Sequence, residues 1–235
     1  MQAFFDQIDA SFSAIDIKLT DKQKQQFYDY YKLLIDWNNK FNLTAITEKT
    51  DVIKKHFLDS CCAVNLLKQN AYILDIGAGA GFPSLPLKIL RPDLKVVLID
   101  SVNKKVTFLQ ETIKALKLDN AIAVHTRAED FAQKKEYREN FDYVVSRAVS
   151  KLNTLSEYAL PFLKQNGLLV AYKSVDTENE IEESKNALNI LGGKIKSIED
   201  VSYEDNVRKI ILVLKTFKTP TKYPRSGNKP RLMPL

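Results

Sequence analysis

The chain of 235 residues is poor in the side chains that build disulfide frameworks and metal centres. It has only two cysteines, the adjacent Cys61 and Cys62, and two histidines, His56 and His125. Adjacent cysteines are poor disulfide partners for each other, and these four residues do not follow a metal-ligand spacing. The sequence therefore predicts neither a structural disulfide nor a bound metal ion.

Long apolar runs are also missing. No stretch approaches the ~20 consecutive apolar residues that are needed to span a bilayer. The first ten residues, MQAFFDQIDA, lack the basic start and the long apolar core of a signal peptide. We therefore expect a cytoplasmic protein without a membrane segment, built as one domain with an appendage. Nothing in the sequence demands more than a monomer.

Glycine is scarce, with seven residues, yet three of them occur at alternate positions in one short stretch. Tyr72–Pro83 reads YILDIGAGAGFP, an apolar run that ends in Asp75 and continues into the three glycines. Without a Cβ, glycine lets the backbone turn sharply out of a buried strand and approach a ligand. A second apolar run ends at Asp100, close to the spacing at which an acid at the second strand end meets a nucleotide ribose. These features predict a nucleotide-like cofactor.

The spacing of the glycines separates two classes of cofactor. Dinucleotide sites use G-x-G-x-x-G and place the pyrophosphate on a helix N-terminus, whereas Gly77, Gly79 and Gly81 follow G-x-G-x-G. Asp75 would repel a pyrophosphate. S-adenosylmethionine carries an ammonium, a sulfonium and a ribose diol, which suit acids at both strand ends. The sequence therefore favours S-adenosylmethionine, with a nicotinamide dehydrogenase as a weaker alternative.

The hydrophobic pattern predicts an α/β fold with an N-terminal helical extension. The first 70 residues read as helical, with a capping box at Thr20 and Gln23 and a helix end in the Asn-rich run 37–44. From Tyr72 onwards strands alternate with helices, which predicts a doubly wound, mostly parallel sheet that binds ligands outside the carboxyl ends of its strands. Seven strands of this kind form the usual Rossmann-like methyltransferase sheet.

The expected elements have definite bounds. The last two strands follow each other without a helix and should therefore pair antiparallel. We also expect a second capping box at Thr154 and Glu157, and a helix end at Gly192. The predicted strands are 72–76, 95–100, 121–125, 141–146, 168–173, 194–203 and 208–216, and the predicted helices of this part are 84–90, 104–116, 155–163 and 178–191.

The C-terminal tail, FKTPTKYPRSGNKPRLMPL, carries five basic side chains and no acid, and so holds +5 of the formal net charge of +6. Four of the eight prolines also lie there, which excludes regular structure. Cations meet phosphates and an aromatic ring can stack on a base, so the tail predicts an RNA contact. A solvated, flexible end is the alternative. The RNA-binding candidates of the tail are Lys222, Tyr223, Arg225, Lys229 and Arg231. Lys173, at the end of the fifth strand, is a further candidate, and for it a solvated lysine without a partner is the alternative.

Six segments occur in a recognisable order: WNNKFNLTAI (37–46), HFLDS (56–60), LDIGAGAGFP (74–83), RAE (127–129), FDYVVSRAV (141–149) and YPRSGNKP (223–230). Together they resemble the bacterial small-subunit ribosomal RNA guanine-N7 methyltransferases, the glucose-inhibited division protein B family. Many methyltransferases share the glycine loop, whereas the SRAV and YPR segments and the W-N-x-x-x-N-L-T start are far more specific. The resemblance implies 16S ribosomal RNA or the small subunit as partner, and three parts: a helical segment 1–70, a methyltransferase domain 71–217 and a basic tail 218–235.

The resemblance also implies a set of methyl-donor contacts. Gly77 and Phe82 fall where the loop of the family meets the donor, the pair after the third strand falls beside the adenine, and Arg147 matches an arginine of the cofactor site. For Glu129 and Arg147 a surface ion pair is the alternative. The departure from the family pattern, at Cys61–Cys62, touches no proposed role. The cofactor-binding candidates are Gly77, Gly79, Phe82, Asp100, Ala128, Glu129 and Arg147.

Guanine N7 is a lone-pair acceptor without a proton, so its methylation needs no general base. Orientation of the reactants can supply about 7–11 kcal/mol of the barrier, and we name no catalytic acid or base. After the fourth strand the chain has SRAV where methylation of an exocyclic amine would need an Asn/Asp-Pro-Pro-aromatic pocket, and Ser146 there either positions the base or caps the strand. Two other functions stay open: a methyltransferase for a small molecule or protein, and an RNA-binding assembly factor with a vestigial cofactor pocket.

Overall fold

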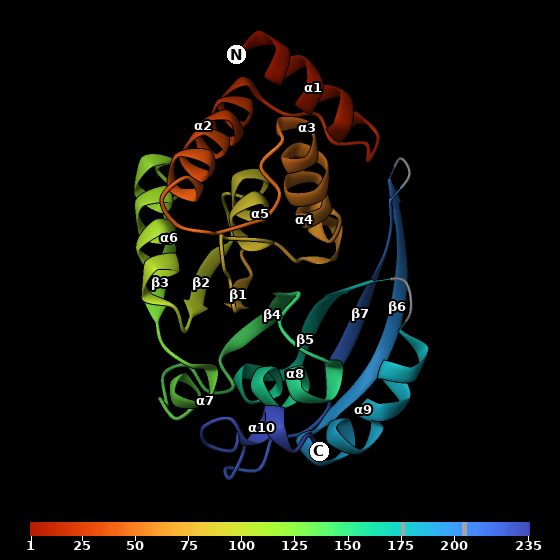
Figure 1. Cartoon of the computed structure of the whole chain (residues 1–235). Helices are drawn as coiled ribbons and strands as arrows, with labels where there is room; N and C mark the ends of the chain where they lie inside the picture. Colours follow the sequence, from red (N-terminus) through yellow and green to blue (C-terminus); the bar gives the residue numbers. More distant parts are fainter. Residues whose placement is uncertain (175–176, 204–205) are drawn as a thin grey trace. The chain divides into compact units, whose positions relative to one another are not determined.

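The computed structural model describes residues 1–174, 177–203 and 206–235 (Figure 1). Among these residues, seven strands form one sheet in the order β3-β2-β1-β4-β5-β7-β6. β2 pairs with β3, β1 with β4 and β4 with β5 in parallel, whereas β7 is antiparallel to both β5 and β6. The predicted fold class is thereby confirmed. The strands are β1 (Tyr72–Ile76), β2 (Lys95–Asp100), β3 (Ala121–His125), β4 (Phe141–Arg147), β5 (Leu163–Lys173), β6 (Gly193–Tyr203) and β7 (Asn206–Lys215).

The described chain divides into two compact units. The first unit contains residues 1–70 and 78–125, and the second contains residues 71–77 and 126–235. The polypeptide passes from one unit to the other inside the glycine-rich loop, between Gly77 and Ala78. The three parts predicted from the sequence follow a different division and stay a prediction.

The first unit is rich in helices. Its longest helix begins with the predicted capping box, in which the backbone N–H of Gln23 donates to Thr20 Oγ1 (3.3 Å) and the backbone N–H of Thr20 donates to Gln23 Oε1 (2.9 Å). The helix ends at Asn38, whose side-chain oxygen accepts from two following backbone N–H groups, and this confirms the predicted end. The helices are α1 (Gln2–Ser13), α2 (Asp21–Asn38), α3 (Lys49–Asp51), the π-helix η1 (Val52–Leu58), α4 (Asp59–Cys61), the 3₁₀ helix η2 (Val64–Leu66), α5 (Ser84–Leu90) and α6 (Asn103–Ala115).

The second unit packs its helices and sheet around an aromatic cluster. The ring of Phe162 lies 5.9 Å from that of Phe131 and 6.1 Å from that of Phe141, and all three are fully buried. Gly192 ends α9 in a left-handed conformation (φ +84°), as predicted. The helices of this unit are α7 (Ala128–Phe131), α8 (Leu152–Ala159), the 3₁₀ helix η3 (Leu160–Phe162), α9 (Glu178–Leu191) and α10 (Lys229–Leu232).

Two sequence predictions for the second unit are wrong. The capping box at Thr154 and Glu157 does not form, because α8 begins at Leu152 and both side chains lie inside it, where they bind the C-terminal tail. The tail itself is not without regular structure, since α10 accommodates Pro230 in its first turn. A proline is tolerated there because the first N–H groups of a helix have no partner within it.

Candidate functional site

Asp100, at the carboxyl end of β2, fixes the glycine-rich loop. Its Oδ2 accepts a hydrogen bond from the backbone N–H of Gly79 (2.9 Å), and its Oδ1 accepts one from the backbone N–H of Val102 (2.9 Å). The side chain is 6% exposed. A carboxylate has about four lone-pair sites, so each oxygen keeps capacity for a further donor such as a ribose hydroxyl. Asp100 and the glycine loop, the two features behind the predicted cofactor site, are therefore joined by a direct hydrogen bond.

Aromatic side chains from the N-terminal helices hold the rest of the loop. The hydroxyl of Tyr30 donates to the carbonyl oxygen of Ala80, and the Tyr30 ring stacks on Phe82 with centroids 5.6 Å apart. His56 stacks on Phe82 as well, at 4.3 Å, while its Nε2 lies 2.8 Å from Thr44 Oγ1. Phe82, a predicted donor contact, is thus held between two rings.

Close packing also explains one glycine of the loop. Gly81 has φ +93°, and a Cβ at this position would lie 2.5 Å from the Tyr30 hydroxyl oxygen and 2.6 Å from Leu85. Sequence reasoning did not find the role of Tyr30, because its partner lies fifty residues away in the chain. Of the two residues whose rings stack on Phe82, only His56 lies in one of the segments singled out from the sequence, HFLDS.

The loss of the Tyr30 hydroxyl is predicted to weaken donor binding moderately. In Tyr30→Phe the carbonyl of Ala80, a residue 5% exposed, loses its donor. A lost hydrogen bond of this kind costs about 0.5–1.5 kcal/mol. We therefore expect the Kd for S-adenosylmethionine to rise about three- to tenfold in calorimetric titration. Tyr31→Phe, on the half-buried neighbouring ring, is the control, and equal affinity of the two variants would contradict this role.

In the second unit, the segment that follows β4 packs on the first glycine of the loop. Gly77 has φ +68°, and a Cβ there would lie 2.6 Å from Val149 Cγ2. Ala148, just before that valine, has φ +58°, which is unusual for a residue with a Cβ. The Oγ of Ser146 donates to the carbonyl oxygen of Ile76 (3.2 Å) and is buried. Ser146 therefore ties β4 to β1, which favours the structural role over contact with a base.

The predicted adenine contacts lie at the start of α7. Ala128 and Glu129 are 9% and 7% exposed. Arg127 Nη1 lies 3.5 Å from Glu129 Oε1, and the Arg127 side chain is about half exposed. Glu129 is thus a buried carboxylate with an arginine beside it, not part of an ion pair exposed on both sides. Arg147, half-buried, ends β4 opposite Tyr172 of β5.

The RNA-binding candidates fall into two groups. Lys222, Lys229 and Arg231 are exposed on the tail. Tyr223 is 6% exposed, which corrects the expectation that its ring can stack on a base. Arg225 donates two hydrogen bonds from Nε and Nη2 to the buried Glu157.

Lys173 also has protein partners. Its Nζ donates to the carbonyl oxygen of Ser150 (2.8 Å) and pairs with Glu180 Oε1, and its side chain is 11% exposed. It is therefore not the solvated lysine that the sequence left open as an alternative. Its ammonium is shared between an acid and a backbone carbonyl, so it offers little to a phosphate.

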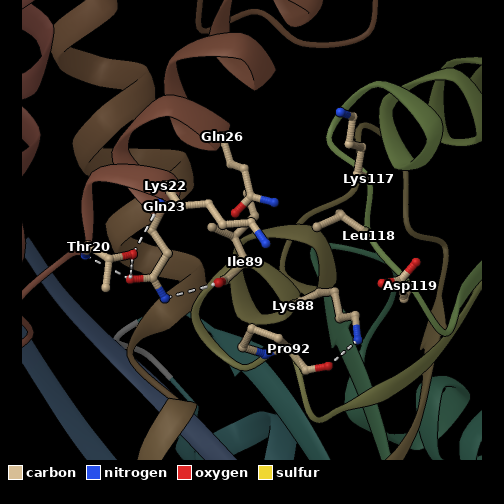
Figure 2. A pocket seen from close by; sticks show the side chains of 10 residues that line it. All are labelled: Thr20, Lys22, Gln23, Gln26, Lys88, Ile89, Pro92, Lys117, Leu118 and Asp119. Carbon is tan, nitrogen blue, oxygen red and sulfur yellow. Dashed lines mark hydrogen bonds between the residues drawn. The ribbon is translucent and has the colours of Figure 1, made fainter.

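The first unit has a pocket of about 260 Å³ that none of the predicted site residues lines (Figure 2). It is lined by residues that precede β2 and β3, such as Pro92 and Asp119, whereas Asp100 ends β2 at the opposite edge. Lys88 there donates to the carbonyl oxygens of Pro92 (2.7 Å) and Leu94 (2.5 Å), and burial lowers the pKa of its ammonium. The Lys88 charge thus supports the turn before β2.

Within residues 1–174, 177–203 and 206–235, no three side chains of His, Cys, Asp or Glu are grouped so that they could hold a metal ion. No helix in this part of the chain combines the length and apolar character needed to cross a membrane.

The sheet order, the glycine-rich loop after β1 and the acid at the end of β2 define an S-adenosylmethionine-dependent methyltransferase. Among solved structures, M. jannaschii TYW2 in complex with AdoMet has the same fold. The TM-score is 0.54 at 22% identity, over 72% of this chain and 77% of that one.

Closer relatives give the family. The family model for GidB, rRNA small subunit methyltransferase G, matches residues 23–211. Ribosomal RNA small subunit methyltransferase G of Lactococcus lactis subsp. cremoris is 47% identical over 98% of both chains. The protein of the same name from Streptococcus gordonii is 49% identical over 93% of this chain and 94% of its own. The chain therefore belongs to the rRNA small subunit methyltransferase G family.

Proposed function

We propose that the protein transfers the methyl group of S-adenosylmethionine to N7 of a guanine in the 16S ribosomal RNA of the small subunit. The observation that carries the proposal is the 47% identity, over nearly the whole chain, to a relative named for methylation of small-subunit ribosomal RNA. We further propose that the protein acts in the cytoplasm as a monomer.

Each unit carries proposed donor contacts of its own. From the first unit we assign Gly79 and Asp100, which are joined by a hydrogen bond, and Phe82, which stacks on Tyr30. From the second unit we assign Gly77, Ala128, Glu129 and Arg147. When bound, S-adenosylmethionine supplies an electrophilic methyl group. The assigned side chains bind and orient it, Asp100 by accepting from the ribose hydroxyls through its free lone pairs.

No proton has to be removed during the proposed transfer. Guanine N7 attacks with its own lone pair, so the residues at the site act by orientation and not as acids or bases. The buried hydroxyl of Ser146 fits this reading, since it donates to the carbonyl oxygen of Ile76. The product purine carries a positive charge, so Arg147 is assigned to the donor or to a phosphate and not to the base.

The RNA contact is assigned to the exposed cations of the tail. Lys222, Lys229 and Arg231 are exposed and point to phosphate binding. Arg225 and Lys173 are paired with carboxylates, and Tyr223 is buried, so these three are left out of the proposed RNA surface.

A charge-matched comparison of two triple variants tests this proposal. The first variant replaces Lys222, Lys229 and Arg231 by alanine. The control replaces Lys185, Lys194 and Lys196, which are exposed on α9 and β6, and removes the same net charge. The association constant K for small ribosomal subunits from cells lacking the enzyme is measured against salt concentration, together with initial rates of methyl transfer.

Removal of three phosphate contacts should reduce the slope of log K against log salt concentration by about 2–3 in the tail variant. The control should keep the wild-type slope. Identical slopes for the two variants would favour a small molecule or a protein as the acceptor. RNA binding by the wild type without any transfer would favour the assembly-factor alternative.

A further inference from the structure

The C-terminal segment 218–235 is bound to the body of the second unit at its start. Arg138, which is half-buried, donates from Nη1 to the carbonyl oxygen of Tyr223 (2.9 Å). Its Nη2 donates to the carbonyl oxygens of Thr219 (3.1 Å) and Pro220 (3.3 Å). One guanidinium therefore satisfies three carbonyl groups of a segment that has few hydrogen bonds of its own.

A buried ion pair fixes the middle of the segment. Glu157 of α8 is fully buried and accepts from the backbone N–H of Arg225 (2.8 Å), from its Nε (2.9 Å) and from its Nη2 (2.7 Å). The same Nη2 donates to the carbonyl oxygen of Met233 (2.8 Å). The hydrogen bonds to Glu157 raise the pKa of the Arg225 guanidinium, which therefore stays charged.

Beyond the ion pair, a second contact holds α10. The Oγ1 of Thr154 donates to the carbonyl oxygen of Pro230 (3.1 Å), and Pro230 is buried. The exposed turn between Arg225 and Pro230 is therefore fixed at both ends. Asn228 lies in this turn, and its Oδ1 accepts a hydrogen bond from Arg127 Nη1 (3.2 Å).

Arg127 connects Asn228 to Glu129, which is a proposed donor contact. Nη1 of Arg127, the atom that donates to Asn228, lies 3.5 Å from Glu129 Oε1. The Glu129 side chain is 7% exposed and that of Arg127 is 53% exposed. A buried carboxylate depends on its counter-ion for charge and orientation, whereas a half-exposed arginine has many rotamers unless it is held.

We propose that Asn228 is a positioning residue for the methyl donor, which acts by holding Arg127 against the carboxylate of Glu129. This inference rests on the proposed function, in which Glu129 contacts the donor. The tail is then part of the donor site as well as an RNA surface. The ion pair Arg225–Glu157 anchors the turn that carries Asn228.

Burial raises the pKa of the Tyr158 phenol, and the charges of Glu129 and Glu157 raise it further. Both carboxylates therefore act on the same ring of α8. Glu157, which anchors the tail, and Glu129, the proposed donor contact, therefore both lie near Tyr158.

The test measures donor affinity on the full chain without RNA. Titration calorimetry with S-adenosylmethionine and with S-adenosylhomocysteine compares the wild type with Asn228→Ala, Arg127→Ala and the double variant. Asn228→Asp keeps an acceptor for Arg127, and Ser226→Ala changes an exposed neighbour in the same turn. Melting temperatures are recorded for every variant.

Asn228→Ala should raise the Kd about three- to tenfold, as expected for one lost hydrogen bond, with little change in melting temperature. Arg127→Ala should raise it at least as much, and the double variant should be no worse than Arg127→Ala, because the two residues act as one unit. Asn228→Asp should bind within about twofold of the wild type.

Other results would overturn the proposal. These are an unchanged Kd in Asn228→Ala, fully additive effects in the double variant, or an equal loss in Ser226→Ala. A different set of results would contradict the proposed function. These are a wild type that binds no donor, or one that binds donor tightly without methylating small subunits. Tight donor binding by both the wild type and Asn228→Ala contradicts only the positioning role of Asn228.

Discussion

Asp100→Ala is expected to reduce kcat/KM for methyl transfer by about 100-fold or more. The substitution removes the acceptor for the backbone N–H groups of Gly79 and Val102. A hydrogen bond to a charged acceptor contributes about 1.5–3 kcal/mol, and every 1.36 kcal/mol is about a factor of ten. The proposed contact with the donor ribose is lost as well. Most of the effect should therefore fall on donor Kd, measured by calorimetry beside single-turnover rates.

Two further variants make this prediction specific. Asp100→Asn keeps one carbonyl oxygen but turns an NH₂ group towards the second N–H, so we expect an intermediate loss of about tenfold. Asp119→Ala removes an exposed acid just before β3, at the opposite edge of the sheet, and should leave the rate within about twofold of wild type. Donor affinity in Asp100→Ala equal to that of the wild type would rule out the assigned role.

The second large effect is on stability. Arg225→Ala should lower the free energy of unfolding by about 3–5 kcal/mol, because it leaves the carboxylate of Glu157 buried without its counter-ion. Urea denaturation of the full chain measures this loss. Replacement of both residues by methionine should recover most of the stability, since a buried ion pair can be exchanged for packed apolar side chains at small cost.

An exposed ion pair of the same unit provides the control. Lys151 and Glu183 are 2.9 Å apart, with side chains 68% and 49% exposed. Lys151→Ala should therefore change the free energy of unfolding by less than about 1 kcal/mol. If Arg225→Ala costs no more than Lys151→Ala, the tail is not anchored by a buried pair.

This anchor changes how the tail can be studied. Deletion of residues 218–235 would remove Arg225, the counter-ion of Glu157. The deletion would therefore lower stability, and a loss of activity would not by itself report on RNA binding. Substitution of the exposed cations alone leaves the anchor in place. The charge-matched triple variants described above follow from this distinction.

Local patterns predicted much of the fold. β1, β2 and β3 were predicted with the bounds that the structure has, because each is a short apolar run bounded by polar or turn residues. β5 begins five residues earlier than predicted, since its first part contains the exposed run Lys164–Asn166, which does not look like a strand. The π-helix η1 was not foreseen, because the spacing of apolar residues hardly distinguishes one turn of π-helix from α-helix.

The proposed donor contacts could be selected from the sequence where their residues are close in the chain or fall at a fixed spacing. Asp100 and the glycines are of this kind. The supporting residues are not, because their partners are distant: Tyr30 bonds a residue 50 positions away, Arg225 one 68 positions away and Arg127 one 101 positions away. For the same reason, composition alone predicted an RNA-binding tail without regular structure and did not reveal that the buried Glu157 binds it through Arg225.

The proposed reaction is tested most directly by transfer of a labelled methyl group from S-adenosylmethionine to small ribosomal subunits from cells lacking the enzyme. The product is mapped by strand cleavage specific for N7-methylated guanine. We predict a single cleavage at one guanine of 16S ribosomal RNA, formed about 100-fold more slowly at low donor concentration when Asp100→Ala replaces the wild type. Label on another atom, or no transfer by a wild type that binds the donor tightly, would contradict the proposed reaction.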